Sequence, residues 1–331
     1  MNRIIHFSLV LFFGFSVAWG QEQLQNTLLF GKADAGKLLR AYTEPGFRSA
    51  MSAMVSGWHA SARPLHSGRL NFQLLIVGAG DDAANIDLRN LGLQVGQIVP
   101  SKPTTATILG GDGGVLSLPD SRGGSQELSL LNGSALPVLP FVCGQFNVGI
   151  TRNTELNFRL GVLPISGNLL LTGGWGFKHE LKQWIPAIAL SNFDVSVFGN
   201  FSAVSLGYNL TIDNLPAGDN PNDQVWKFQG NNFALGTIFS KRFSLLTVAT
   251  GLQYMKGTGN MQLAGTYLVG EPGRDPVPMR DPISQSFEQS QVSGIFAVRL
   301  SLGIISVQVT GNGSKNPSAS MSFIVGRVQR R

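Results

Sequence analysis

The sequence contains one cysteine, Cys143, among 331 residues. A single thiol cannot form an internal disulfide, so packing and hydrogen bonds must hold the fold together. A cysteine nucleophile would need a histidine to activate it, and no local pattern links Cys143 to any of the histidines. Its apolar surroundings, LPFVCGQF, instead indicate a small buried hydrophobic residue.

Charge is also scarce: Asp, Glu, Lys and Arg make up 13% of the chain, while glycine occurs 41 times. An average soluble domain has about 25% charged residues and about 7% glycine. A surface that meets lipid would not need the missing charge. The net charge of +6 is scattered and is not interleaved with aromatic residues, which argues against nucleic acid as a partner.

Long hydrophobic runs are absent after the first 20 residues. Residues 1–20, MNRIIHFSLVLFFGFSVAWG, have a basic start at Arg3, an apolar stretch and the small residues Ala18 and Gly20, which predicts a secretory signal peptide cleaved after Gly20. An uncleaved anchor is the alternative. The apolar stretch is shorter than the roughly 20 residues of a spanning helix, and polar residues interrupt every later apolar run, which excludes a helix-bundle membrane protein.

From about Leu70 the apolar residues recur at every second position, the period of a β-strand. In residues 154–162, TELNFRLGV, leucine and phenylalanine occupy one face, and Glu155, Asn157 and Arg159 the other. The same alternation recurs in residues 71–78, 145–153, 202–213, 245–254, 260–269, 305–311 and 321–326. Strands with one apolar face and one polar or small face predict an all-β fold, an antiparallel transmembrane β-barrel of about 12–14 strands. A secreted β-sandwich is the alternative, but its outer face would carry more Lys and Glu.

Residues 21–58 have helical rather than strand periodicity. Pro45 is expected to break the helix, and the apolar spacing then resumes. The segment is either a plug inside the barrel or a cap over it, and a strand near Ser56 remains an alternative. The candidate residues for the plug and lumen are Leu38, Leu39, Tyr42, Met51 and Met54.

Residues 175–190, WGFKHELKQWIPAIAL, interrupt the strand pattern with helical spacing, limited by Pro186. We expect a short amphipathic helix here. It either lies at the membrane interface with Trp184 as its anchor or packs over one end of the barrel.

Two stretches of the sequence resemble ligand-binding motifs, one for a dinucleotide and one for Ca²⁺. Gly78, Gly80 and Ala83 have the G-x-G-x-x-A spacing of a dinucleotide site, but no α/β alternation follows, so we expect a turn at a strand end. Asp213, Asp219 and Asp223 lie in a polar loop and are weak candidates for Ca²⁺ ligands, although exposed turns use the same residues. No catalytic motif is present, so we predict neither an enzyme nor a cofactor.

Three stretches carry a resemblance to a known family: Gly57 to Arg63 (G-W-x-x-[ST]-A-[KR]), N-T-E-L at 153–156, and Lys178 to Pro186 (K-H-x-[IL]-x-Q-W-I-P). With Tyr42 and Pro45, they make the chain resemble an uncharacterised family of exported proteins from Bacteroidetes-type bacteria, known as a domain of unknown function. The resemblance implies a β-barrel at the outer membrane and brings no catalytic residues. In layout, the helical segment before a barrel is similar to the long-chain fatty-acid transporter family, whose N-terminus plugs the pore.

The sequence thus predicts a signal peptide at 1–20, a helical segment at 21–58 and a β-barrel at 59–331, in the outer membrane of a Gram-negative bacterium. The expected function is passive uptake of small or apolar solutes. The alternative is a surface or periplasmic β-protein with an adhesive or structural role in the envelope. The expected partners are outer-membrane lipid, the barrel-insertion machinery and an unidentified small solute.

Overall fold

The computed structural model describes residues 20–119, 124–136, 138–165, 168–210, 223–271 and 274–326. Nearly all of the expected signal peptide, residues 1–19, therefore lies outside the described residues. No helix in the described part of the chain is long and apolar enough to cross a membrane.

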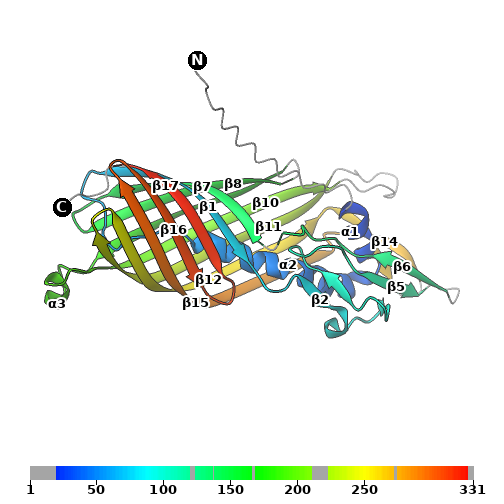
Figure 1. The fold of residues 1–331 in the computed structure, drawn as a ribbon. Helices are drawn as coiled ribbons and strands as arrows, with labels where there is room; N and C mark the ends of the chain where they lie inside the picture. Colours follow the sequence, from blue (N-terminus) through cyan, green and yellow to red (C-terminus); the bar gives the residue numbers. More distant parts are fainter. Residues whose placement is uncertain are drawn as a thin grey trace, which may run out of the picture.

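Ten antiparallel strands of the described chain close into a barrel, in the order β1-β17-β16-β15-β12-β11-β10-β9-β8-β7 (Figure 1). β1 closes the ring by pairing with both β7 and β17. The strands are β1 (Leu70–Gly80), β7 (Val138–Gly149), β8 (Thr154–Ile165), β9 (Asn168–Glu180), β10 (Asp194–Leu210), β11 (Gln224–Phe243), β12 (Leu246–Ala264), β15 (Ile283–Leu302), β16 (Ile305–Gly313) and β17 (Ser318–Val325). The predicted transmembrane-type barrel architecture is confirmed.

The predicted number of 12–14 strands is wrong, because two segments that read as separate strands belong to one. Residues 246–254 and 260–264 both lie in β12, which runs through Gly257 and Gly259 without a turn. The following segment forms a hairpin outside the wall, β13 (Thr266–Glu271) with β14 (Arg274–Arg280). Glycine therefore marks a close approach within a strand here rather than a strand end.

Two helices precede the barrel, α1 (Gly20–Leu28) and α2 (Gly31–Val55). The expected break at Pro45 is wrong, since α2 continues through it. A proline removes one helical hydrogen bond. Three residues earlier, the Tyr42 carbonyl oxygen accepts a hydrogen bond at 3.0 Å from the backbone amide of Ile108, so a neighbouring segment supplies a donor at the disturbed turn. The helix ends at Val55, and no strand forms at Ser56.

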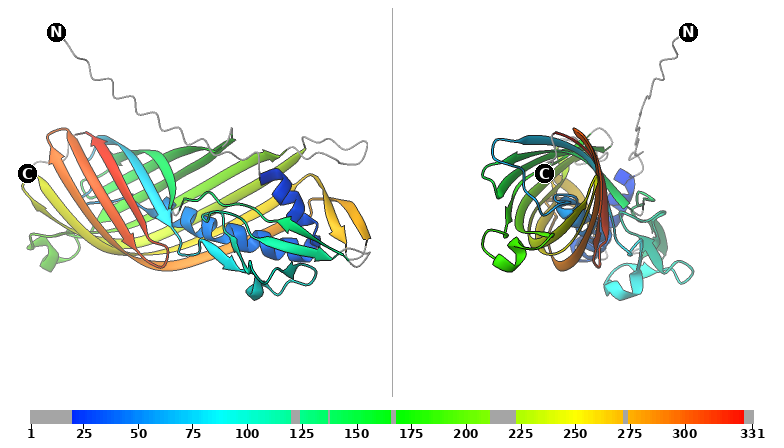
Figure 2. Two further views of the ribbon diagram at one scale, coloured as in Figure 1. Left: turned by 45° about the vertical axis from the view of Figure 1, so that its right-hand side comes forward. Right: turned by 60° about the vertical axis from the view of Figure 1, so that its left-hand side comes forward.

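Two stretches of the range that the sequence assigned to the barrel lie outside its wall. Residues 59–69 precede β1, and the described residues 81–119 and 124–136 belong to an insertion between β1 and β7. The insertion contains β2 (Asn85–Asp87), η1 (Leu88–Leu91), β3 (Gln97–Ile98), β4 (Thr104–Ala106), β5 (Val115–Pro119) and β6 (Ser125–Ser129). Figure 2 shows it with α1 at the end of the molecule where the long strands project, while α2 runs into the barrel. Its sheets are β2-β4 and β3-β5-β6.

The outer surface of the closed barrel is apolar. Exposed apolar side chains include Leu74, Phe146, Phe158, Leu160, Phe233, Leu252, Phe296, Val309 and Phe323. Between them the inward side chains are mainly polar and buried, as in β8 with Glu155, Asn157 and Arg159. An apolar outer band around a polar interior is the arrangement of a barrel in lipid, and the opposite of a soluble β-sandwich.

The apolar face changes sides along the long strands. On β12, Leu252 and Tyr254 point outward, whereas further along Met261 and Leu263 point inward and are fully buried. Beyond the apolar band the outward positions become polar, as at Lys256. The ends of the long strands therefore leave the lipid-facing zone and use their inner face to pack against α2.

The helix predicted over residues 175–190 is largely wrong. β9 continues to Glu180, and only α3 (Pro186–Ala189) is helical, beginning at the proline that was expected to limit it. Pairing with β8 and β10 fixes this segment as strand. Tertiary hydrogen bonding thus overrides a weak helical pattern.

A charge in the apolar band should prevent stable insertion. Leu252→Arg places a guanidinium on the lipid face, and we expect this to destabilise the barrel folded in bilayers by about 2–4 kcal/mol. The control is Thr258→Arg, on the same face of β12 but beyond the band, where the change should be small. Urea titration of folding into lipid vesicles measures both, and equal effects would contradict the assignment of the band.

Candidate functional site

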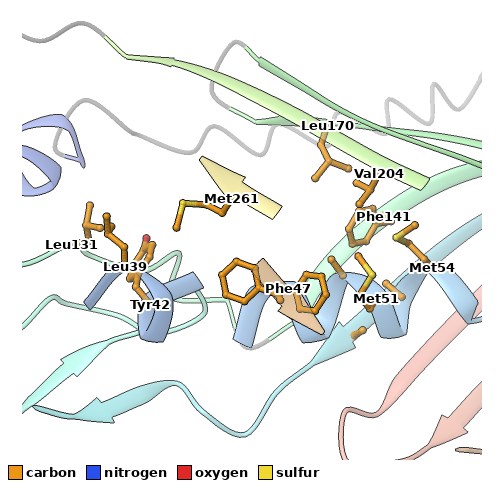
Figure 3. Close-up of a cluster of buried hydrophobic side chains, with 14 of the residues drawn as sticks. Leu39, Tyr42, Phe47, Met51, Met54, Leu131, Phe141, Leu170, Val204 and Met261 are labelled. Carbon is orange, nitrogen blue, oxygen red and sulfur yellow. The ribbon is translucent and has the colours of Figure 1, made fainter. Parts of the chain in front are cut away.

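The lumen of the barrel is occupied by α2. Its Phe47 ring stacks on Phe287 of β15 with centroids 5.3 Å apart and meets Phe228 of β11 edge-on at 6.1 Å. Figure 3 shows Phe47, Met51 and Met54 along the helix, with Phe141 and Val204 of the wall beside its inner end. These residues belong to one buried cluster, so the helix is packed as a core element rather than lying loosely in a pore.

Glycines in the wall let α2 come close. A Cβ on Gly259 would lie 2.6 Å from the Phe47 ring, and one on Gly257 would lie 2.8 Å from the Met51 sulfur. A Cβ on Gly230 would lie 2.9 Å from the same methionine. Such distances leave no room for a side chain, so these glycines form a strip on which the helix is seated.

Four of the five predicted plug residues lie in this lumen cluster: Leu39, Tyr42, Met51 and Met54. Leu38 does not, because it points from α2 into a second cluster with Leu88, Leu116 and Leu128 of the insertion. Burial raises the pKa of the Tyr42 phenol well above its usual range, so it stays protonated and donates to the Asn132 carbonyl oxygen at 2.8 Å.

The insertion is fastened to α2 by a buried carboxylate. Asp34 is 1% exposed and accepts hydrogen bonds from three successive backbone amides, Gln94 at 2.9 Å, Val95 at 2.7 Å and Gly96 at 3.1 Å. Lys37 Nζ also lies 3.9 Å from Oδ1, so the buried carboxylate is satisfied by three amides and one cation. No local pattern indicated Asp34, since its partners lie about 60 residues away.

Arg159 of β8 binds the C-terminal end of α2 inside the barrel. Its Nη1 donates to the Ser56 carbonyl oxygen at 2.8 Å, its Nε and Nη2 donate to Gln145 Oε1 at 3.0 and 2.8 Å, and its guanidinium lies 4.1 Å from the Trp58 ring centroid. A cation at the C-terminal carbonyls of a helix is favourable. Gly57 then turns the chain with φ of 73°, a left-handed conformation that glycine adopts readily.

The chain beyond Gly57 runs through the rest of the lumen in an extended form. Both backbone groups of Ala62 are hydrogen-bonded to the wall: its amide donates to Ser240 Oγ at 2.9 Å, and its carbonyl oxygen accepts from Ser196 Oγ. The Leu65 amide donates to Glu155 Oε2 at 2.8 Å. Wall side chains thus satisfy the backbone groups of a buried segment that has no secondary structure of its own.

The stretches that carried the family resemblance meet at this place. Glu155 lies in the N-T-E-L stretch, and its Oε1 is 3.2 Å from the Nζ of Lys178 in the K-H stretch, with both side chains buried. The Gly57–Arg63 stretch belongs to the lumen segment that the wall side chains hold beside this pair. Nearby, Nε2 of His59 lies 3.2 Å from Asn200 Oδ1. Sequence alternation placed Glu155 and Arg159 on the polar face but did not indicate their partners.

A cavity with a volume of about 720 Å³ opens beside α2. It lies along β10, β11, β12 and β15, where Val204, Gly230, Gly259 and Phe287 form one row across the wall. Arg40 and exposed polar residues such as Glu288 also line it. Because Phe47 and Met51 fill the lumen side of the glycines, the cavity does not continue through the barrel.

The remaining predicted residues lie elsewhere. Asp213 and Asp219 are outside the described residues, Asp223 is exposed, and the described chain holds no cluster of metal-binding side chains. Trp184 lies in the connection between β9 and β10 and is 70% exposed. Its Nε1 donates to His179 Nε2 at 3.1 Å. Cys143 is buried as expected.

The dinucleotide-like spacing belongs to a strand end, as the sequence suggested. Gly78 and Gly80 lie in β1. Asp81 then turns the chain, accepting from the Ala83 amide at 2.9 Å, and its other carboxylate oxygen lies 3.3 Å from Arg48 Nε of α2. These contacts join the end of β1 to the helix in the lumen and leave no phosphate-binding turn.

A family model described as a family of unknown function, DUF6588, matches residues 1–326. No curated protein matches the sequence. Similar solved structures include the outer membrane protease OmpT from Escherichia coli (9% identity, TM-score 0.33, covering 80% of this chain and 98% of that one) and the translocator domain of the autotransporter NalP from Neisseria meningitidis (10%, 0.30, 91% and 99%). A Pseudomonas aeruginosa FadL homologue has 10% identity and a TM-score of 0.22, covering 91% and 98%. At these TM-scores the barrel assignment rests on this chain's own strand pairing.

Removing one partner of the buried ion pair should destabilise the barrel. Lys178→Met leaves the Glu155 carboxylate buried without its cation, and we expect a loss of about 3–5 kcal/mol in the free energy of unfolding. The matched control is Lys256→Met, which breaks the exposed pair with Glu288 and should change stability little. Chemical denaturation in detergent measures both, and similar losses would show that the buried pair has no special role.

Proposed function

Because the chain belongs to the family of unknown function DUF6588, we propose its function from its own geometry: an outer-membrane β-barrel that admits small solutes when the plug formed by α2 shifts. The observation that carries the proposal is a polar-walled lumen filled by one continuous segment, α2 and residues 56–65. The proposal involves no catalysis and no cofactor.

The surface supports placement in an outer membrane. An apolar band surrounds the closed part of the barrel, and the connections differ between its two ends. Turns of a few residues join β7 to β8, β11 to β12 and β15 to β16 at one end, whereas the insertion and the β13–β14 hairpin emerge at the other. Outer-membrane barrels keep short turns on the periplasmic side and long loops outside. In this orientation the insertion faces the exterior, and Trp184 lies at the periplasmic rim, where tryptophan anchors barrels.

Contacts of unequal strength hold the plug along its length. The inner end is bound by the charged groups Arg159 and Glu155. The middle of α2 makes mainly apolar contacts on the glycine strip, with two direct hydrogen bonds from the wall: Asn232 Nδ2 to the Met51 carbonyl oxygen at 2.7 Å, and Gln291 Nε2 to Ser52 Oγ at 2.9 Å. Neutral hydrogen bonds contribute about 1 kcal/mol each, so the middle of the plug is the part that moves at least cost. Leu39, Tyr42, Met51 and Met54 are then the gating residues.

The filled lumen also supports a second function, a non-transporting envelope protein that presents its insertion to the exterior. In that case α2 is a permanent core element, and the barrel serves only as a membrane anchor. The two functions differ in whether α2 moves relative to β12.

A disulfide between α2 and β12 distinguishes them. A Cβ on Gly257 would lie 3.3 Å from Met51 Cβ, close to the roughly 3.5–4.5 Å of a disulfide. Replacing Met51 by cysteine also removes the Met51 Sδ and Cε atoms, so that the new Cβ on residue 257 no longer meets Sδ. The variant is Met51→Cys with Gly257→Cys in a Cys143→Ser background, reconstituted in vesicles for solute-swelling assays.

We expect oxidation to lower solute flux at least tenfold, and reduction to restore it. Each single cysteine variant is the control and should not respond to oxidant. Equal flux in the oxidised and reduced double variant would show that α2 does not gate the barrel. A wild-type protein that inserts but passes no solute would favour the envelope function instead.

A further inference from the structure

One face of α2 is polar and made of small residues. Ser49, Ser52 and Ser56 follow one another at helical spacing and are almost fully buried. Ser52 meets Gln291 of β15, and Gly57, next to Ser56, lies against Ser320 of β17. The serine face therefore borders the part of the wall formed by β15, β16 and β17, where the inward residues are also polar.

Many polar atoms at this boundary have no hydrogen-bond partner among the described residues. They are Ser49 Oγ, Ser56 Oγ, His59 Nδ1, Gln253 Nε2, Gln289 Oε1, Gln291 Oε1, Ser293 Oγ and Ser320 Oγ. All but Gln291 belong to residues that are at most 8% exposed. Each such group loses its hydration on burial, at a cost that native proteins avoid by supplying a partner. This number of unpaired polar atoms at one boundary indicates that they share a partner that is not protein.

Strand pairing places several of these residues in one row along the plug. Gln289, Gln291 and Ser293 are successive inward positions on β15, and Ser293 pairs across the wall with Gln253 of β12. From Gln253 this row reaches His59 through a small cavity of about 10 Å³, which is also lined by Thr310 and Asn312 of β16. Thr310 is in turn the cross-strand neighbour of Ser320.

The volume of this cavity and the chemistry of the unpaired atoms suit water. A space of about 10–15 Å³ accommodates one water molecule, which needs two to four polar partners. With its Nε2–H donating to Asn200, His59 presents Nδ1 as an acceptor, while Gln253 Nε2 is a donor. A water molecule between them donates to one and accepts from the other. The serine hydroxyls do either, so the same molecule type satisfies the remaining atoms.

We infer that a file of ordered water molecules is bound between the serine face of α2 and the β12–β15–β16–β17 wall, from Gln289 to His59. It bridges the plug to the barrel where direct hydrogen bonds are few. The water file does not depend on solute uptake, because an immobile plug has the same unpaired atoms.

Stability measurements on variants of the full mature chain test the inference. Ser293→Ala and Gln253→Met remove two of the unpaired groups. If water binds them, each change strands a water molecule, and the thermal midpoint in detergent should fall. The matched control is Ser240→Ala, which loses a direct bond to the Ala62 amide; we expect shifts of the same sign and similar size. If the groups are dry, removing them relieves a desolvation cost, and a raised or unchanged midpoint in both variants would overturn the inference.

A crystal structure of the wild-type protein that shows ordered water gives the second readout. We expect density within hydrogen-bond distance of both His59 Nδ1 and Gln253 Nε2, and its loss in Gln253→Met. A wild-type map with no density there would refute the water file whatever the variants' stability. Because density is read without any flux assay, failure of this inference and failure of the proposed uptake are seen separately.

Discussion

A closed ring of backbone hydrogen bonds is the constraint on which this structure depends. Each of the ten wall strands is paired with a neighbour on both sides. The ring closes at β1, which pairs with β7 on one side and with β17 on the other. Lipid offers no partner for a backbone amide or carbonyl, so a spanning sheet must have no free edge. Once the ring is closed, alternate side chains have no choice but to face lipid or lumen. The apolar band and the polar interior both follow from this geometry.

The second constraint is that the interior must be filled. Ten strands enclose a space in which α2 and the extended segment after it replace solvent, and the wall adapts to them. Glycine is present where Phe47 and Met51 press on the wall, and Arg159 and Glu155 are placed where backbone groups of the plug need partners. The long strands show the same adaptation beyond the lipid zone, because their apolar face turns inward to cover the helix. The plug is therefore part of the fold that the barrel is built around.

Local pattern was sufficient to predict much of this. Period-two alternation identified seven of the ten wall strands in the described chain, all but β9, β11 and β15. It also put Glu155 and Arg159 on the polar face, and helical spacing identified the segment that became α2. The errors arose where a residue type has two physical uses. Residues 245–254 and 260–269 were expected to form separate strands, but Gly257 and Gly259 between them lie within β12 and contact α2. Pro45 was expected to break the helix but lies inside it, beside a donor from the insertion. The helical spacing at residues 175–190 was weaker than the pairing that β8 and β10 offer.

The sequence by itself determined the fold class, the alternation of apolar and polar faces in most wall strands, and the presence of a helical segment ahead of the barrel. These follow from the spacing of apolar residues, which acts over a few positions along the chain. Only the tertiary structure decided the number of wall strands, the passage of α2 through the lumen, the attachment of the insertion by Asp34 and the pairing of Glu155 with Lys178. Each of these depends on which distant segments meet, and that is set by the register and closure of the whole ring rather than by any local stretch.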